Sequence, residues 1–130
     1  MDLFQKINFV SHAGVPLKWK IECDAIKPQE WDCFATMIMD YQKDPFQKAI
    51  GIPRGGVPLG NALNKYATGN KKHSILVCDD VYTTGTSFRE FCTSKDTMWA
   101  YRWVVFARKP IPESEGVKAL FSMPPLTSKV

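Results

Sequence analysis

ILVCDDVYTTGTS, residues 75–87, is the stretch of sequence that decides the fold class. Its first four residues are apolar without alternation, which predicts a strand that is covered on both faces, as in a parallel sheet. Asp79 and Asp80 follow at the expected end of this strand, and a small polar turn at 83–87 leads into a helix that is expected to begin at Ser87. In open α/β sheets, ligands bind outside the carboxyl ends of the strands, so these polar residues are candidates for a binding site.

The turn after the strand has the chemistry of a phosphate site. A helix N-terminus presents backbone N–H groups and a positive dipole end to an anion. Gly85 lets the backbone approach closely. Hydroxyl donors come from the other residues of the turn, Thr83, Thr84, Thr86 and Ser87. Asp79 and Asp80 repel a phosphate, but they can accept hydrogen bonds from ribose hydroxyls or hold Mg²⁺ directly or through water. The stretch therefore predicts a site for a sugar phosphate.

The rest of the chain alternates strand and helix patterns. Apolar runs at 49–52 and 103–107 predict further buried strands, and helical spacing predicts helices at 28–42 and 57–66. Strands at 4–12 and 17–23, divided by Ala13-Gly14-Val15-Pro16, predict an N-terminal hairpin. After Pro110 the chain is expected to be loop-like, with a short apolar run at 117–123. The pattern predicts an α/β protein with a parallel-sheet, Rossmann-like core in one domain, residues 1–130.

Residues 75–87 resemble the ribose-phosphate signature of type I phosphoribosyltransferases, which combines an apolar strand, an acidic pair and a Thr/Gly-rich turn. The resemblance implies that Asp79 and Asp80 bind the ribose of phosphoribosyl pyrophosphate and that Thr83, Thr84, Gly85, Thr86 and Ser87 cradle its 5′-phosphate. It also implies a phosphoribosyltransferase-like fold, Mg²⁺ as the cofactor, and a function in nucleotide metabolism.

A second segment, Gly51-Ile52-Pro53-Arg54-Gly55-Gly56, resembles the pyrophosphate loop of the same family and lies one helix upstream, in the order that the family uses. The resemblance assigns pyrophosphate binding to Pro53, Arg54, Gly55 and Gly56, and a catalytic role to Arg54 together with the acidic pair. Arg54 can pair with pyrophosphate oxygens, and the glycines can expose backbone N–H groups to them. The run matches neither the dinucleotide nor the P-loop pattern.

The resemblance covers residues 49–109 and gives only weak pointers to a base. Tyr82 occupies the position of a residue beside the base, where its ring would stack, or it is simply a packed side chain. Arg108 follows the third core strand, near the base site of the family. It would contact a base or an acidic substrate there, or it would be solvated at the surface.

The chain departs from the family between the pyrophosphate-loop helix and the ribose-phosphate strand. Only Ala67–Ser74 separates them, which leaves no room for the family's mobile catalytic loop. Two functions stay open: a compact enzyme that transfers phosphoribosyl to a base and releases pyrophosphate, or a catalytically inactive module that binds a phosphoribosyl ligand or a nucleotide.

Composition restricts the other classes. Lys and Arg number 17 against 13 Asp and Glu, a net charge of +4 that suits an anionic small molecule. No basic stripe is interleaved with aromatic residues, which disfavours nucleic acid. The four cysteines form no C-x-x-C pair, so a zinc or redox site is poorly supported. No apolar run is long enough for a membrane helix, and the first residues do not read as a signal peptide, so a cytoplasmic protein is expected. The family resemblance also suggests a homodimer.

Overall fold

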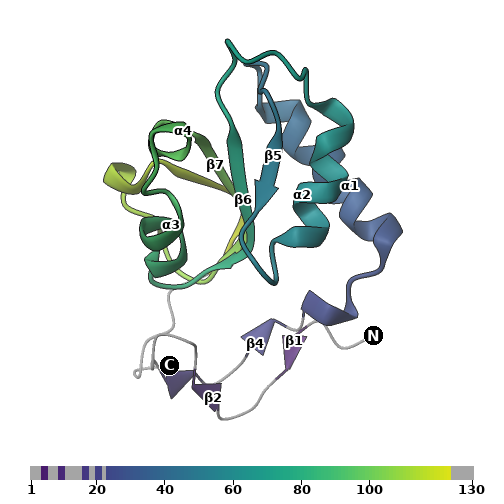
Figure 1. Cartoon of the computed structure of the whole chain (residues 1–130). Coiled ribbons are helices and arrows are strands. Elements are labelled where there is room, and N and C mark those ends of the chain that lie inside the picture. Colours follow the sequence, from purple (N-terminus) through teal and green to yellow (C-terminus); the bar gives the residue numbers. More distant parts are fainter. Residues whose placement is uncertain (1–3, 6–8, 11–15, 18–19, 22, 124–130) are drawn as a thin grey trace.

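A four-stranded parallel sheet forms the centre of the protein, with the strand order β5–β6–β7–β8 (Figure 1). The computed structural model describes residues 4–5, 9–10, 16–17, 20–21 and 23–123. The strands are β5 (Ala49–Gly51), β6 (Leu76–Tyr82), β7 (Tyr101–Ala107) and β8 (Val117–Ser122). The expected α/β fold with a parallel sheet is confirmed.

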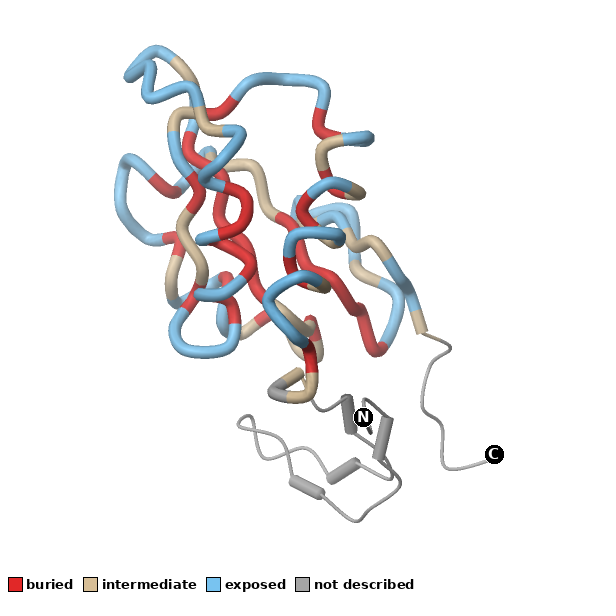
Figure 2. The backbone as a smooth tube through the Cα atoms, turned by 90° about the vertical axis from the view of Figure 1, so that its right-hand side faces the viewer, coloured by how far each residue is buried: buried red, intermediate tan, exposed pale blue. Residues whose placement is uncertain are grey.

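Helices cover both faces of this sheet (Figure 1). On one face, α1 (Pro28–Tyr41) and α2 (Val57–Leu63) pack Ile38 and Leu59 against Leu76 of β6. On the other face, α3 (Thr86–Phe91) packs Phe88 against Val77 and Val104. Figure 2 shows the buried residues running along the strands between the helix layers. This double cover explains why the strand sequences are apolar without alternation. None of the helices in the described part of the chain is both long and apolar enough to cross a membrane.

The short elements complete the chain. They are η1 (Cys23–Ala25), η2 (Asn64–Tyr66), α4 (Lys95–Met98) and η3 (Glu113–Glu115). The helix expected at 28–42 is α1, whose first residue is Pro28 and whose Glu30 side chain accepts a hydrogen bond from the Lys27 N–H at 3.0 Å. The helix expected at 57–66 is α2, which tightens into η2 over its last turn.

Two crossover connections of the sheet have opposite hands. The strands advance in one direction, yet α2 connects β5 to β6 across one face and α3 connects β6 to β7 across the other. Because about 98% of such crossovers are right-handed, one of these two is a rare left-handed connection. The short segment 67–75 leads α2 directly into β6 and leaves no length for additional strands between them.

Three sequence expectations require correction. The strand expected to end at Cys78 continues to Tyr82, because its pairing with β7 includes Asp79↔Val104 and Val81↔Phe106. The strand expected at 103–107 begins at Tyr101. The region after Pro110 is not loop throughout, since β8 pairs in parallel with β7.

The N-terminal hairpin is present in its described pieces. β1 (Phe4–Gln5) pairs antiparallel with β4 (Lys20–Ile21), and β2 (Phe9–Val10) pairs antiparallel with β3 (Pro16–Leu17). Pro16 belongs to β3, and the other residues expected in the turn lie outside the described residues.

Candidate functional site

The acidic pair lies within β6, at a break in the alternation of its side chains. Val77 packs on the α3 face, and a regular strand would place Val81 on the same face. Instead Val81 packs toward α1 and Tyr82 toward α3. At the break, the carboxylates bind the backbone: the Asp80 N–H donates to Asp79 Oδ1 and the Val81 N–H donates to Asp80 Oδ1, both at 2.8 Å. These bonds fix the two carboxylates beside the main chain.

The two carboxyl groups differ in burial. Asp79 is 7% exposed, whereas Asp80 is half-buried. Burial, followed by the side-chain hydrogen bond and the charge of Asp80, raises the pKa of Asp79 to about 8, although the backbone hydrogen bond from Asp80 lowers it. Burial thus favours the protonated form of Asp79 at neutral pH.

The donor set suits a hydrated magnesium ion. Within residues 23–123, no group of three or more His, Cys, Asp or Glu side chains is placed to hold a metal. Mg²⁺ usually takes one or two carboxylates and completes its shell with water and phosphate oxygens. Asp79 and Asp80 supply that number of carboxylates, so the residues present fit the ion that the sequence predicted.

The loop that follows β5 lies against the acidic pair. The Ile52 N–H donates to the Cys78 carbonyl at 2.8 Å, and the Gly56 N–H donates to the Ile52 carbonyl at 2.9 Å, which closes the loop beside β6. A Cβ atom on Gly55 would lie 2.4 Å from Asp80 Oδ2, so only glycine permits this approach. Arg54 is exposed on the same loop. The structure thus joins the two motifs that the sequence analysis singled out.

The turn after β6 surrounds a small cavity. Gly85 has a φ of +82°, a left-handed conformation that glycine adopts without strain. The cavity has a volume of about 20 Å³, and its lining includes Asp79, Tyr82, Thr83, Gly85, Thr86 and Ser87. The helix that follows begins at Thr86 and has six residues, so the hydroxyls and backbone of the turn matter more for an anion here than the helix dipole.

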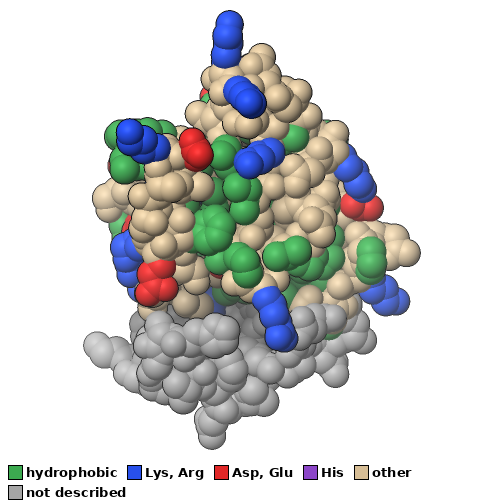
Figure 3. All heavy atoms as spheres, viewed as in Figure 1, with side chains coloured by type: hydrophobic (Ala, Val, Ile, Leu, Met, Phe, Trp, Pro, Cys, Tyr) green, Lys and Arg blue, Asp and Glu red, His purple; other side chains and the backbone are tan. Residues whose placement is uncertain are grey.

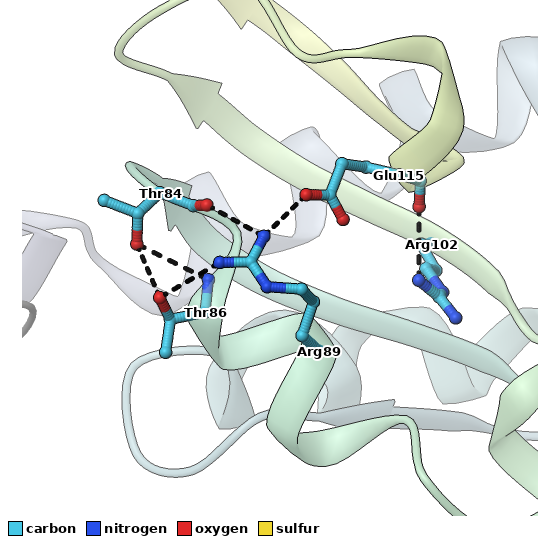
Figure 4. Close-up of polar contacts among 5 residues, drawn as sticks. All are labelled: Thr84, Thr86, Arg89, Arg102 and Glu115. Carbon is cyan, nitrogen blue, oxygen red and sulfur yellow. Dashed lines mark hydrogen bonds and ion pairs between the residues drawn. The ribbon is translucent and has the colours of Figure 1, made fainter.

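Three charged residues that the sequence analysis missed support this turn (Figure 4). Arg89 Nη1 donates to the Thr84 carbonyl at 3.1 Å and to Glu115 Oε1 at 2.6 Å. Arg102 Nη1 donates to the Glu115 carbonyl at 3.1 Å. Arg89 follows Gly85 by one helical turn, and this spacing could have indicated its return to the turn. Glu115 comes from η3 after β7, and no sequence signal places it there.

Comparisons with known structures agree on the fold. Orotate phosphoribosyltransferase from Aeropyrum pernix matches with a TM-score of 0.68 at 16% identity, over 92% of this chain and 88% of that chain. UMP synthase from Leishmania donovani matches with a TM-score of 0.66 at 16% identity, over 92% of this chain and 33% of that chain. No family model matches the sequence, and neither does any curated protein. The fold is a phosphoribosyltransferase fold.

The two residues with a weak base-binding assignment are buried at the end of the phosphoribosyltransferase-like sheet. Tyr82 is 2% exposed, in keeping with the packed alternative, and its carbonyl accepts the Arg108 N–H at 3.0 Å. The expectation that Arg108 is solvated is wrong, because it is 5% exposed. Burial lowers the pKa of its guanidinium. Contact of either residue with a base stays a prediction.

A larger cavity lies away from the predicted site. It has a volume of about 340 Å³ and lies between α1 and α2, lined mainly by Trp31, Pro58, Ala62 and Lys65. It contains none of the residues that the motifs identify, so its size does not make it the functional site. Figure 3 shows apolar side chains between the helices and the sheet on one face of the molecule, with Lys and Arg scattered around them.

Proposed function

We propose that this chain binds a phosphoribosyl ligand, either phosphoribosyl pyrophosphate or a nucleoside monophosphate, at the carboxyl end of β6. The observation that carries the proposal is the contact of Gly55 with Asp80, because it unites a loop suited to pyrophosphate with an acidic pair suited to ribose. The similarity to an orotate phosphoribosyltransferase supports the same class of ligand.

Each part of the site has a role in this proposal. Asp79 and Asp80 accept hydrogen bonds from the ribose hydroxyls, and the 83–87 turn donates to the 5′-phosphate. Arg54 and the N–H group of Gly55 face the pyrophosphate, whereas the Gly56 N–H is already bound to the Ile52 carbonyl and holds the loop in shape. Asp79 and Asp80 would hold Mg²⁺ directly or through water, and the ion would neutralise pyrophosphate charge. The ionised form of Asp79 is the one that would hold the cation, so a bound cation would oppose the effect of burial on the pKa of this carboxyl group.

Transfer of the phosphoribosyl group is the reaction that this arrangement can support. The bond from the ribose C1 to a pyrophosphate oxygen breaks, and a base nitrogen forms the new bond to C1 and releases its proton to water. Pyrophosphate leaves toward Arg54 with both electrons of the broken bond. No protein nucleophile is needed, because positioning and charge stabilisation carry the rate.

One observation favours binding without turnover. The 67–75 connection enters β6 at its amino end, and Figure 1 shows it at the end of the sheet opposite the one where β6 leads into α3. Closing loops exclude water and complete a catalytic site, and this connection cannot reach the ligand to do so. A binding or regulatory module is therefore the second candidate.

Calorimetric titration of phosphoribosyl pyrophosphate, with and without Mg²⁺, tests the binding site. We expect the Asp79→Asn, Asp80→Asn double variant to lose binding. Asp40→Asn, a change at an exposed position of α1, should bind like the wild type. Absence of binding to the wild type, both with phosphoribosyl pyrophosphate and with nucleoside monophosphates, would refute the proposed function.

Turnover separates the two candidates once binding is established. Pyrophosphate release is measured with a panel of purine and pyrimidine bases under steady-state conditions. Release with one base, lost in the double aspartate variant, identifies an enzyme. Tight binding without release for any base identifies the binding module.

A further inference from the structure

We propose that Arg89 is a positioning residue of the phosphate turn, which holds the Thr84 backbone and the Thr86 hydroxyl in the arrangement that receives the phosphate. This inference rests on the proposed function, because it concerns recognition of the 5′-phosphate by the same turn. Figure 4 shows Arg89 between the two threonines and Glu115.

Arg89 acts on the turn as a donor, because a guanidinium group donates hydrogen bonds and cannot accept them. Its Nη1 donates to the Thr84 carbonyl at 3.1 Å, and its Nη2 donates to Thr86 Oγ1 at 3.4 Å. Thr84 Oγ1 and Thr86 Oγ1 lie 2.8 Å apart and share a hydrogen bond. Arg89 therefore holds the backbone of Thr84 and the hydroxyl of Thr86 at the same time.

A further bond joins the two threonines. Thr84 Oγ1 accepts the backbone N–H of Thr86 at 3.4 Å. Arg89, Thr84 and Thr86 thus form one connected set of hydrogen bonds. A phosphate dianion offers only acceptors, so a turn that presents donors suits it better than one whose hydroxyls rotate freely.

Glu115 holds Arg89 in this position. Its Oε1 lies 2.6 Å from Arg89 Nη1, and its side chain is 17% exposed against 52% for that of Arg89. Arg102 anchors the Glu115 backbone and donates to the Met98 carbonyl at 3.2 Å. Because Glu115 neutralises Arg89, the pair adds little net charge to the site. The contribution of Arg89 is thus orientation more than attraction.

Gly85 shows how tightly the network packs against the turn. A Cβ atom there would lie 2.7 Å from the Tyr82 hydroxyl, 2.9 Å from Arg89 Nη1 and 3.1 Å from Glu115 Oε1. The guanidinium therefore lies against the turn backbone, where a shift of the side chain would move the turn with it.

Three ligands test the inference by titration calorimetry: phosphoribosyl pyrophosphate, ribose 5-phosphate and inorganic pyrophosphate. We expect Arg89→Met to weaken binding of the two ligands that carry a 5′-phosphate about tenfold, because the turn that binds this group loses the charged hydrogen bonds that hold it. Pyrophosphate lacks that group, so it should bind Arg89→Met with the same affinity as the wild type. Lys95→Gln removes an exposed positive charge on α4 and is the charge-matched control for all three ligands.

Arg89→Lys separates orientation from charge and covers the case in which Arg89→Met does not fold. Lysine keeps the charge but lacks the planar fork that reaches Thr84, Thr86 and Glu115 together. We expect its loss of affinity for 5′-phosphate ligands to be close to that of Arg89→Met. Wild-type affinity in Arg89→Lys would overturn the orienting role.

A double-mutant cycle with phosphoribosyl pyrophosphate tests the route through Thr86. If Arg89 acts through this hydroxyl, Arg89→Met combined with Thr86→Val weakens binding no more than the larger single change. Additive losses, equal losses for all three ligands, or unchanged binding by Arg89→Met would each overturn the inference while the proposed function stands. Failure of the wild type to bind any 5′-phosphate ligand removes both.

Discussion

Asp80 is the residue at which the two halves of the site meet. Its carboxylate lies against the backbone of Gly55 on one side and accepts the Val81 N–H on the other. Its neighbour Asp79 is buried, and burial raises the pKa of that carboxyl group. Two adjacent residues of the same type thus lie in different environments, because one faces the core and the other faces the loop.

Gly55→Ala tests the contact between the loop and the acidic pair. The new Cβ would lie 2.4 Å from Asp80 Oδ2, so the carboxylate or the loop must move. We expect the affinity for phosphoribosyl pyrophosphate to fall at least about tenfold, an order of magnitude typical of a misplaced site group. The free energy of unfolding should change by less than about 1 kcal/mol, because Gly55 is exposed.

Gly69→Ala is the matched control for this change. Gly69 has a φ of +70° with nothing within 4 Å of the added Cβ, and it lies in the 67–75 connection. Alanine there should cost about 1 kcal/mol of stability through its left-handed conformation but leave ligand binding unchanged. Equal affinities of the wild type and Gly55→Ala would contradict the proposed contact.

The raised pKa of Asp79 predicts how stability depends on pH. The folded protein keeps the proton up to about pH 8, whereas the unfolded chain releases it near the ordinary pKa of 3.8. Between these values the folded state binds more protons, so the free energy of unfolding falls as pH rises, by at most about 1.4 kcal/mol per pH unit. This contribution is fully present below the unfolded pKa and is lost as pH passes through the folded value.

Urea denaturation of the wild type and Asp79→Asn over this pH range measures the effect. The asparagine variant should show a flatter dependence, because it has no proton to lose at this position. Identical slopes for the two proteins would show that Asp79 does not titrate as its burial requires.

At the scale of elements, Asn64 completes the outer edge of β5. Its Oδ1 accepts the Ala49 N–H at 2.9 Å, and its Nδ2 donates to the Ala49 carbonyl at 2.8 Å and to the Gly60 carbonyl at 3.0 Å. One amide side chain from η2 therefore occupies the place of a further strand. It also ties the end of α2 to the strand that leads into the pyrophosphate loop.

Asn64→Ala should therefore destabilise the protein by about 2 kcal/mol, since it leaves part-buried backbone groups without their partners. Chemical denaturation measures the change, and Asn61→Ala, at an exposed position of α2, is the control, with an expected change within about 0.5 kcal/mol. If Asn64→Ala changed the free energy of unfolding as little as the control, water would replace the hydrogen bonds of the amide without loss of stability.

The sequence patterns predicted which elements exist better than where they end. The apolar run before Asp79 indicated β6, but its last residues are polar or mixed and join the strand only through pairing with β7. β8 is half-exposed at the sheet edge, so its short run after a proline-rich segment looked like part of a loop. Partners in the sheet, rather than local propensity, set these boundaries.

At the scale of the whole molecule, the local motifs predicted the kind of site but not its supporting contacts. The turn at 83–87 and the loop at 53–56 are readable because each is continuous in sequence. The Arg89–Glu115 pair and the burial of Arg108 depend on elements that meet only in the fold. The opposite hands of the two crossovers could not be predicted from the sequence patterns either. These patterns give the order of the elements but not the face of the sheet that each helix covers.

The order of the strands also determines when each part of the sheet can form during synthesis. Each strand of the sheet pairs with the strand that follows it in the chain, so the nascent chain can add strands one at a time without waiting for a distant segment. The acidic pair and the phosphate turn emerge from the ribosome well before Glu115, which fixes Arg89. The contacts of Glu115 with Arg89 therefore form only after residue 115 has been synthesised, and a shorter nascent chain presents the motif without them.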